Sequence, residues 1–311
     1  MSKHSSQINF FIVGAAKCGT TTVFDRLNSR DDVYLSPLKE PNYYSTDIDT
    51  ASFSSEFRAN TNLDLTSYFT QDPLPVKQIG FIRDEELYDR LFEAAPVSAK
   101  LVGDCSTSYL YSTVAAEKIR AAHPDAKILI MLRHPVDRLY SHYMMARKYG
   151  FTSLPLIDSV KKDMSHPKPG WGSSEIFVDL GLYTDQITRY KSHFPDSQIR
   201  ILFTRDLRSE EKWSELLEWL GLPDTQAATL ERSDANTAGL AKFEGLNRAL
   251  TSSGLKKKLG ALIPLGIKKS LVKWYYSDEG LPKITQEERS FLMEIYEDEL
   301  ARLKSEHGIS F

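Results

Sequence analysis

The sequence has few cysteines, no long apolar run and no large excess of charge of one sign. Cys18 and Cys105 are its only cysteines, which fits a reducing compartment better than a disulfide scaffold, with one bridge between them left open. No stretch approaches the roughly 20 apolar residues of a membrane helix, so we expect no stable membrane insertion. The formal charge of −3 gives no overall attraction to nucleic acid. Any anion site in this chain must therefore be local.

Repeats and low-complexity tails are also absent, and 311 residues suffice for one large core. Residues 1–18 imitate a secretory signal, but we expect them to be retained, because cleavage would remove the strand described next. The sequence predicts a single cytoplasmic domain over residues 1–311, with a substrate-side cap or insertion around residues 240–283. Within that insertion, the lysines of residues 256–273 favour a solvated helix pair over a basic cap or a membrane-surface helix.

The chain is organised around residues 10–22, FFIVGAAKCGTTT. The apolar run at its start predicts a strand buried on both faces, because polar and apolar residues do not alternate. Gly14 and Gly19 allow a tight turn whose N–H groups approach an anion, and three threonines supply hydroxyls where a helix begins. The stretch predicts a nest for a phosphate or sulfate-like group. The alternative is an ordinary strand-to-helix turn rich in small residues.

This loop departs from the P-loop of ATP- and GTP-binding proteins in one respect. Its two glycines have the P-loop spacing, but Thr20 stands where the P-loop lysine would be, and Lys17 lies inside the loop. The departure argues against an NTPase and for a lysine that contacts a bridging oxygen. Cys18 in the same loop is either an oxidation target or an inert small residue, and we favour the inert residue.

A second strand, residues 33–36, leads into the segment LKEPNYY. A strand, a crossover helix and a strand in this order predict parallel strands, whose carboxyl ends meet at one edge of the sheet. Open α/β sheets bind ligands at that edge. We therefore expect Lys17 and Glu40 to face one crevice, where Glu40 has a chemical role and is not merely a solvated carboxylate.

A second anion site is predicted in residues 127–150. A buried strand ends at Arg133, and Pro135 suits the first turn of the helix that follows. Arg133 and Ser141 can then point to one spot at the same edge, where a guanidinium and a hydroxyl suit a terminal phosphate. The alternative for Arg133 is an ion pair with Asp137. A solvated helix face is expected from Arg138, Arg147 and Lys148.

The other segments alternate between strand and helix patterns. Strands at residues 100–105 and 198–203 complete a parallel sheet, and the prolines and glycines of residues 151–178 predict a long loop of functional type. Asp104 either contacts a substrate or caps the next helix. One long helix is expected at residues 286–306. The predicted fold class is α/β, a P-loop-like three-layer fold with a central parallel sheet flanked by helices.

These motifs resemble those of the sulfotransferases that use 3′-phosphoadenosine 5′-phosphosulfate (PAPS). AAKCGTTTV resembles their 5′-phosphosulfate loop, LRHPVDRLYSHY their 3′-phosphate motif, and LKEPNYYS a segment of the carbohydrate and bacterial branch. GLYTDQITRYKSHFP and ITQEERSFLMEIYEDELARL extend the resemblance over nearly the whole chain. The chain is similar to the carbohydrate and bacterial-type sulfotransferase domain, and distantly to heparan sulfate sulfotransferases.

The resemblance implies a role for each site residue. Lys17 would contact the sulfate-bridging oxygen, and Glu40 would be the catalytic base. The residues that bind the co-substrate would be Lys17, Cys18, Gly19, Thr20, Thr21, Thr22, Arg133 and Ser141. The implied reaction moves a sulfuryl group from PAPS to a hydroxyl, less readily an amine, of a saccharide, lipid or small-metabolite acceptor and releases 3′,5′-ADP.

No metal is expected, since the sequence shows no ligand cluster, and no nucleic acid partner is expected either. Two other interpretations stay open, a P-loop-like nucleotide kinase or NTPase and a non-catalytic nucleotide-binding module. The position of Lys17 counts against the first, and Glu40 counts against the second. The sequence alone leaves the acceptor open.

Overall fold

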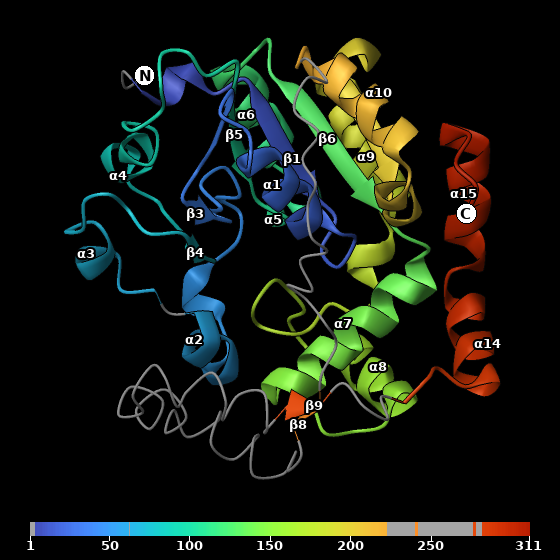
Figure 1. Cartoon of the computed structure of the whole chain (residues 1–311). Helices are drawn as coiled ribbons and strands as arrows, with labels where there is room; N and C mark the ends of the chain where they lie inside the picture. Colours follow the sequence, from blue (N-terminus) through green and yellow to red (C-terminus); the bar gives the residue numbers. More distant parts are fainter. Residues whose placement is uncertain (1–3, 62, 223–239, 242–275, 278–281) are drawn as a thin grey trace.

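The computed structural model describes residues 4–61, 63–222, 240–241, 276–277 and 282–311 (Figure 1). The lysines of residues 256–273 lie outside the described residues, and so does nearly all of the predicted cap at residues 240–283. The described part of that region is a short antiparallel pair, β8 (Leu240–Ala241) with β9 (Tyr276–Ser277).

A five-stranded parallel sheet forms the centre of the molecule, in the order β2-β5-β1-β6-β7. Its strands are β1 (Phe10–Gly14), β2 (Val33–Leu35), β5 (Leu101–Cys105), β6 (Lys127–Leu132) and β7 (Ile199–Phe203). Every residue of β1 and β5 is buried, as strands covered on both faces require. The predicted parallel arrangement is confirmed, although β5 lies between β1 and β2.

Helices flank the sheet and confirm the α/β fold class (Figure 1). They are α1 (Thr20–Asn28), α4 (Glu85–Arg90), α5 (Ser108–Tyr111), α6 (Ala115–Ala122), α7 (Pro135–Tyr149), α9 (Tyr183–His193) and α10 (Glu210–Leu220). The limits of α7 are those that the sequence predicts. Pro135 occupies its first position, and Gly150, with a φ of 85°, follows its last residue.

The carboxyl edge of the sheet is covered by short elements between β2 and β5. They are β3 (Leu38–Lys39), the 3₁₀ turn η2 (Thr50–Ser52), α2 (Ser55–Thr61), α3 (Leu65–Tyr68) and β4 (Lys77–Gln78). β3 and β4 pair in parallel. Four more 3₁₀ turns are η1 (Ser5–Gln7), η3 (Asp179–Gly181), η4 (Asp196–Gln198) and η5 (Thr204–Arg208).

Two element predictions are wrong. The predicted long loop of residues 151–178 contains α8 (Leu156–Met164), which buries Leu156 and Val160 one helical turn apart. The predicted long helix at residues 286–306 is two helices, α14 (Gln286–Ile295) and α15 (Glu297–His307). The break falls at Tyr296, whose buried hydroxyl donates to the carbonyls of Phe177 and Val178.

Arg138 does not lie on a solvated helix face, which corrects the expectation for α7. Its side chain is fully buried. The guanidinium donates to the carbonyl of Phe177 and lies 3.4 Å from Nδ1 of His142. A buried arginine is tolerated when carbonyl and imidazole groups accept from it, so this residue ties α7 to the segment after α8.

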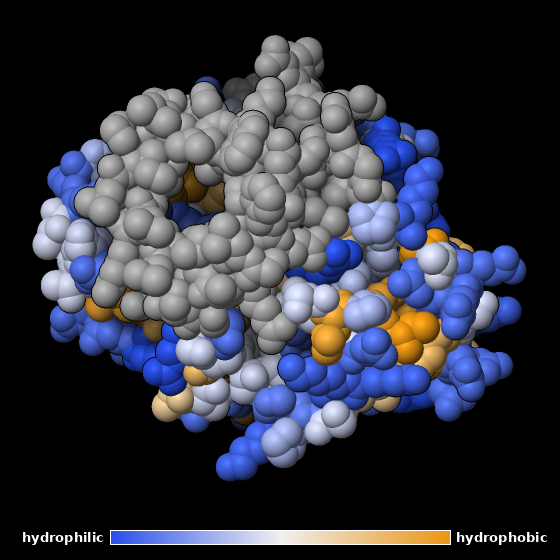
Figure 2. All heavy atoms as spheres, turned by 90° about the horizontal axis from the view of Figure 1, so that it is seen from below, coloured by the Kyte–Doolittle hydropathy of each residue, from blue (hydrophilic) through white to orange (hydrophobic). Residues whose placement is uncertain are grey.

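On the face seen from below, most of the described side chains are hydrophilic, and Figure 2 shows an area where hydrophobic side chains gather. Large exposed hydrophobic residues in the described part are Val76, Val97, Tyr149, Met164 and Met293. None of the described helices combines the length and the apolar character needed to cross a membrane.

Candidate active site

The loop between β1 and α1 has the backbone geometry of an anion nest. Lys17 and Gly19 both adopt positive φ, 69° and 91°, and Gly19 is the residue before the first turn of α1. The first N–H groups of a helix have no acceptor within the helix, so those of α1 are directed out of its N-terminus. Alternating right- and left-handed residues turn successive N–H groups toward one point. The predicted loop geometry is therefore present.

The side chain of Lys17 lies inside a group of cations. Its Nζ is 3.6 Å from Sδ of Met145 on α7. Burial, with repulsion from Lys148 and Arg133, lowers the pKa of Lys17 to about 8, although the attraction of Glu40 opposes these effects. The charged form of this lysine is thus unfavourable in free energy in the unliganded protein, and a bound anion would stabilise it.

Arg133 follows directly after β6, and its backbone carbonyl accepts a hydrogen bond from the hydroxyl of Tyr183. The alternative ion pair with Asp137 is not formed, since Asp137 accepts from Arg289 at 2.8 Å. Repulsion between Arg133 and Lys17 places the two cations in one electrostatic environment.

Ser141 lies on the face of α7 that is directed toward Lys17. Residues 141, 145 and 148 have the spacing of one helix face. Met145 contacts Lys17, and Lys148 lowers its pKa. The structure therefore brings the lysine of the loop, the arginine after β6 and the serine of α7 to one region. Lys148, predicted as part of a solvated face, contributes to that region.

Glu40 is buried and is held at both carboxylate oxygens. Oε1 lies 3.4 Å from Nζ of Lys39, and Oε2 accepts from the hydroxyl of Thr107 at 3.2 Å. Its N–H donates to the carbonyl of Cys105 at the end of β5. The position of Glu40 at the sheet edge agrees with the predicted crevice, and its attraction to Lys17 shows that the two groups are close enough to interact.

Lys39 joins the two halves of the site, and the sequence analysis missed it. Its Nζ donates to the hydroxyl of Thr21 at 2.8 Å while pairing with Glu40. Burial lowers the pKa of Lys39, but Glu40 together with Cys105 and Asp25 outweighs burial, and the net pKa is raised. The available signal was a lysine inside a short apolar strand next to a glutamate, since a buried lysine requires a partner.

Asp104 does not cap the next helix, which corrects that expectation, and its full burial leaves it no surface for a substrate. Its carboxylate is fully buried and accepts from Tyr88, Tyr109 and Ser106. Burial raises its pKa to about 6 against the lowering effect of these hydrogen bonds. Ser106 also accepts from the N–H of Asn42, so this buried network supports the segment that carries Glu40.

Cys18 has the properties of an inert residue. Its thiol is buried 3.6 Å from the hydroxyl of Tyr183, and burial raises its pKa to about 11. Its N–H donates to the carbonyl of Ala15. Both cysteines are free thiols. Co-substrate binding by Cys18, as by Thr20 and Thr22, stays a prediction; Thr20 is buried and Thr22 is exposed.

A buried pair behind α7 was also missed. Nε2 of His142 lies 3.4 Å from a carboxylate oxygen of Glu175. Burial raises the pKa of Glu175 to about 7, and burial together with Arg138 and Lys17 lowers the pKa of His142 well below its usual range. His142 is therefore neutral at pH 7. Within the described residues no group of three or more His, Cys, Asp or Glu side chains is placed to hold a metal ion.

The arrangement suits a reaction on an anionic group. Cations from the loop, β3, α7 and the residue after β6 surround an N–H nest, and one carboxylate stands beside them. Such a site can hold a substrate that carries phosphate or sulfate and can accept a proton from a second substrate.

Comparisons with known proteins point in the same direction. A family model described as the sulfotransferase family matches residues 9–226. Carbohydrate sulfotransferase 15 of Homo sapiens is 24% identical over 275 residues, covering 74% of this chain and 47% of that protein. The bifunctional heparan sulfate N-deacetylase/N-sulfotransferase 1 of Xenopus laevis is 27% identical over 237 residues, which cover 71% of this chain and 24% of that protein. The chain thus spans about half the length, or less, of these curated relatives.

The fold is shared with a solved structure. A sulfotransferase from Alicyclobacillus acidocaldarius superposes with a TM-score of 0.67 and 24% sequence identity, covering 98% of this chain and 97% of that one. This likeness supports the α/β fold with a P-loop-like centre.

Proposed function

We propose that this chain, which belongs to the sulfotransferase family, transfers the sulfuryl group of PAPS to an acceptor hydroxyl and releases 3′,5′-ADP. The observation that carries the proposal is the electrostatic position of Lys17. Its pKa is lowered to about 8 by burial and by neighbouring cations, at a nest of loop N–H groups. A co-substrate with anionic groups at two points supplies the charge that this site needs.

The residues present fit PAPS. Lys17 and the N–H groups from Gly19 onward would hold the 5′-phosphosulfate, and Arg133 with Ser141 would hold the 3′-phosphate. Lys39 and Lys148 add charge near the first group. When bound, PAPS supplies an activated sulfuryl group whose leaving group is a phosphate oxygen.

Glu40 would accept the proton of the acceptor hydroxyl as that oxygen bonds to sulfur. The electron pair of the broken sulfur–oxygen bond stays on the bridging oxygen, where Lys17 stabilises the developing charge. Lys39 and Thr107 orient the two oxygens of Glu40. Our assignment uses no metal and no covalent intermediate on the protein.

The acceptor is proposed to be a saccharide hydroxyl, because the curated relatives named above include a carbohydrate sulfotransferase. Lipid and small-metabolite hydroxyls, and an amine, are the other acceptors to include in a screen. The cytoplasmic location stays a prediction from the sequence.

Thermal unfolding with nucleotides tests the co-substrate. We expect PAPS and 3′,5′-ADP to raise the melting temperature, whereas ATP with Mg²⁺ should not, because the loop lacks the P-loop lysine position. A response to ATP alone would favour a kinase or NTPase. Transfer of labelled sulfate from PAPS to any acceptor separates an enzyme from a nucleotide-binding module, and Lys17→Ala should abolish that transfer.

A further inference from the structure

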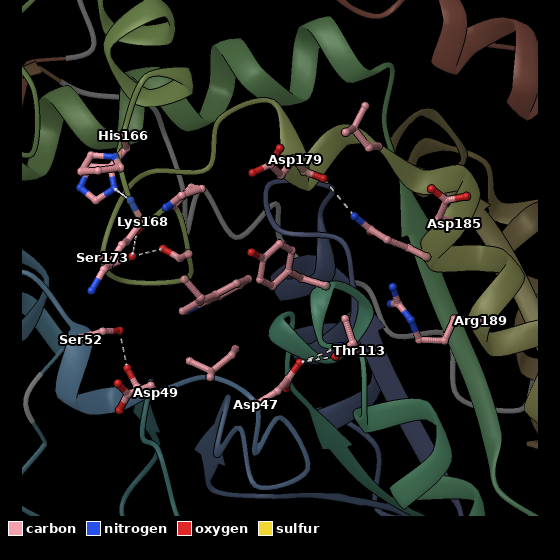
Figure 3. Close-up of a pocket in the computed structure, with 18 residues that line it drawn as sticks. Asp47, Asp49, Ser52, Thr113, His166, Lys168, Ser173, Asp179, Asp185 and Arg189 are labelled. Carbon is pink, nitrogen blue, oxygen red and sulfur yellow. Dashed lines mark hydrogen bonds between the residues drawn. The ribbon is translucent and has the colours of Figure 1, made fainter.

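A cavity of about 890 Å³ opens between the segments before α2, after α5, after α8 and along α9 (Figure 3). Its walls come from residues 47–52, from the end of α5, from residues 166–173 and from α9. None of these residues belongs to the anion site described above. The cavity therefore offers a second binding region.

The cavity and Glu40 share one supporting element. Thr107, which donates to Glu40, immediately precedes the single-turn helix α5, and Tyr111 at the end of α5 lines the cavity. Four residues of helix span roughly 6 Å. Asp47, which also lines the cavity, is fixed to the residues after α5 by hydrogen bonds from Ser112 and Thr113. The proposed base and the cavity lining are thus joined through one short element of the chain.

Two aromatic rings stand in the wall of the cavity. Tyr111 and Trp171 have ring centroids 6.0 Å apart and planes inclined by 44°. Neither ring is fully buried. Paired aromatic faces next to polar groups suit a ligand with an apolar face and a hydroxylated rim. Each ring therefore offers an aromatic face to a ring of that kind.

The loop that carries Trp171 is fixed in place. Gly172 has a φ of 76° and lies so close to Phe53 that a Cβ there would be 2.5 Å from the aromatic ring. The carbonyl of Gly172 accepts from the N–H of Ser54. The carboxylate of Asp163 accepts from three successive N–H groups after the loop. A fixed loop loses little conformational entropy when a ligand binds.

The charge of the cavity is opposite to that of the anion site. Asp47 and Asp49 lie on one side and Asp179 and Asp185 across from them in Figure 3, against the cations Lys168 and Arg189. Asp185 is paired with Arg302 outside the cavity. Burial raises the pKa of Asp47, but hydrogen bonds from Ser112 and Thr113 outweigh burial, so the net pKa is lowered and the group stays ionised. This wall repels polyanions.

We infer that this cavity binds an uncharged sugar ring of an oligosaccharide acceptor while another ring presents its hydroxyl to Glu40. The inference rests on the proposed function and narrows its acceptor. The aromatic pair supplies the stacking surface, and the aspartates supply acceptors for sugar hydroxyls. The same negative charge disfavours glycans that carry many carboxylates or sulfates, including a heavily sulfated product.

Labelled transfer from PAPS tests the acceptor class. Uncharged oligosaccharides and uronate-rich or sulfated oligosaccharides of equal length are compared at the same ionic strength. We expect kcat/KM to be at least tenfold higher for the uncharged series. Preference for the polyanionic series, or for phenolic or lipid acceptors, would overturn the inference. Absence of transfer to all saccharides by a protein that binds 3′,5′-ADP would also overturn it.

Variants test the cavity itself. Trp171→Ala should raise the KM for uncharged oligosaccharides at least tenfold, Trp171→Phe should restore most of the affinity, and 3′,5′-ADP binding should not change in either. Asp179→Lys should change the ratio of kcat/KM between the two acceptor series at least fivefold in favour of the polyanionic series. Glu218→Lys, on the exposed face of α10, is the control and should not change that ratio. An unchanged KM in Trp171→Ala would contradict the inference. If the unmodified protein did not bind 3′,5′-ADP, the proposed function itself would be rejected.

Discussion

Lys39 donates a hydrogen bond of 2.8 Å from Nζ to the hydroxyl of Thr21 and lies 3.4 Å from the carboxylate of Glu40. One side chain therefore connects the proposed co-substrate loop with the proposed catalytic base. Because all three residues are wholly or partly buried, the connection is shielded from solvent and its electrostatic effect is stronger than at the surface.

Replacing Lys39 tests this connection. In Lys39→Met the carboxylate of Glu40 loses its cationic partner and the hydroxyl of Thr21 loses its donor. We expect kcat to fall at least tenfold, and the free energy of unfolding to fall by about 3 kcal/mol, because a buried charge is left unpaired. Steady-state kinetics and urea unfolding measure the two effects. Lys77→Met, on the exposed strand paired with β3, is the control and should change neither.

Replacing Glu40 tests the base. Glu40→Gln keeps the size of the side chain but cannot accept the proton, so kcat should fall by about 10²–10⁴-fold. The Kd for 3′,5′-ADP, measured by calorimetry, should change little. Thr107→Val removes one hydrogen bond to the carboxylate and should lower kcat about fivefold, as expected for ~1 kcal/mol. Glu86→Gln on the exposed start of α4 is the matched control. Full turnover in Glu40→Gln would exclude this assignment.

The lowered pKa of Lys17 predicts how co-substrate binding depends on pH. Lys17 is charged below its pKa of about 8 and loses its charge above it. The affinity for PAPS should therefore fall as the pH rises from 7 to 9.5. Lys17→Arg should flatten that dependence over the same interval, because a guanidinium stays charged. Binding of PAPS that does not change with pH in the unmodified protein would contradict the prediction.

The same pKa predicts the stability of the free protein. A lysine whose pKa is lower in the folded state than the ordinary 10.5 disfavours folding while it is charged. That cost is fully present below about pH 8 and disappears as the pH rises to 10.5. Lys17→Met should thus melt a few degrees higher than the unmodified protein at pH 7 without ligand, and the difference should shrink above pH 8. A lower melting temperature for Lys17→Met at pH 7 would oppose this account.

Gly19 and Gly308 form a matched pair of glycines with positive φ. Gly19→Ala would place a Cβ 2.6 Å from Cδ1 of Leu207 at a φ of 91°, whereas Gly308, with a φ of 68°, has no such neighbour within 4 Å. Both variants should lose about 1 kcal/mol of stability from backbone strain. Only Gly19→Ala should weaken 3′,5′-ADP binding, by at least tenfold in calorimetry. Equal effects of the two variants on binding would show that the loop geometry is not needed.

Replacing Arg138 and replacing Arg302 compare the contribution of a buried arginine to stability with that of an exposed one. Arg138→Met removes the charged donor to the carbonyl of Phe177, which keeps only the hydroxyl of Tyr296, and should cost about 2–3 kcal/mol in urea unfolding. Arg302→Ala removes exposed ion pairs with Asp185 and Glu306 and should leave the urea unfolding midpoint nearly unchanged, because water and salt screen such pairs. Similar losses for the two variants would contradict the structural role of Arg138.

Local patterns of the sequence predicted the sheet and its two loops. The apolar runs of β1, β5 and β6 have no alternation, which requires burial on both faces and therefore a parallel sheet between helix layers. Pro135 and Gly150 marked the ends of α7. Proline restricts φ to a value that suits the first turn of a helix, and glycine permits the left-handed conformation that follows the last turn. Irregular segments were harder, and α8 was missed because prolines and glycines around it outweighed its short apolar pattern.

The sequence by itself determined the loop from Gly14 to Thr22, the order of the strands along the chain and the carboxylate at Glu40, since each follows from local residue types. Only the tertiary structure decided which side chains meet. The bond from Lys39 to Thr21, the burial of Arg138 and the cavity between Tyr111, Trp171 and Asp179 join residues that lie on separate elements. The charge of a residue can be read from the sequence, but its burial and its partners depend on how distant segments pack.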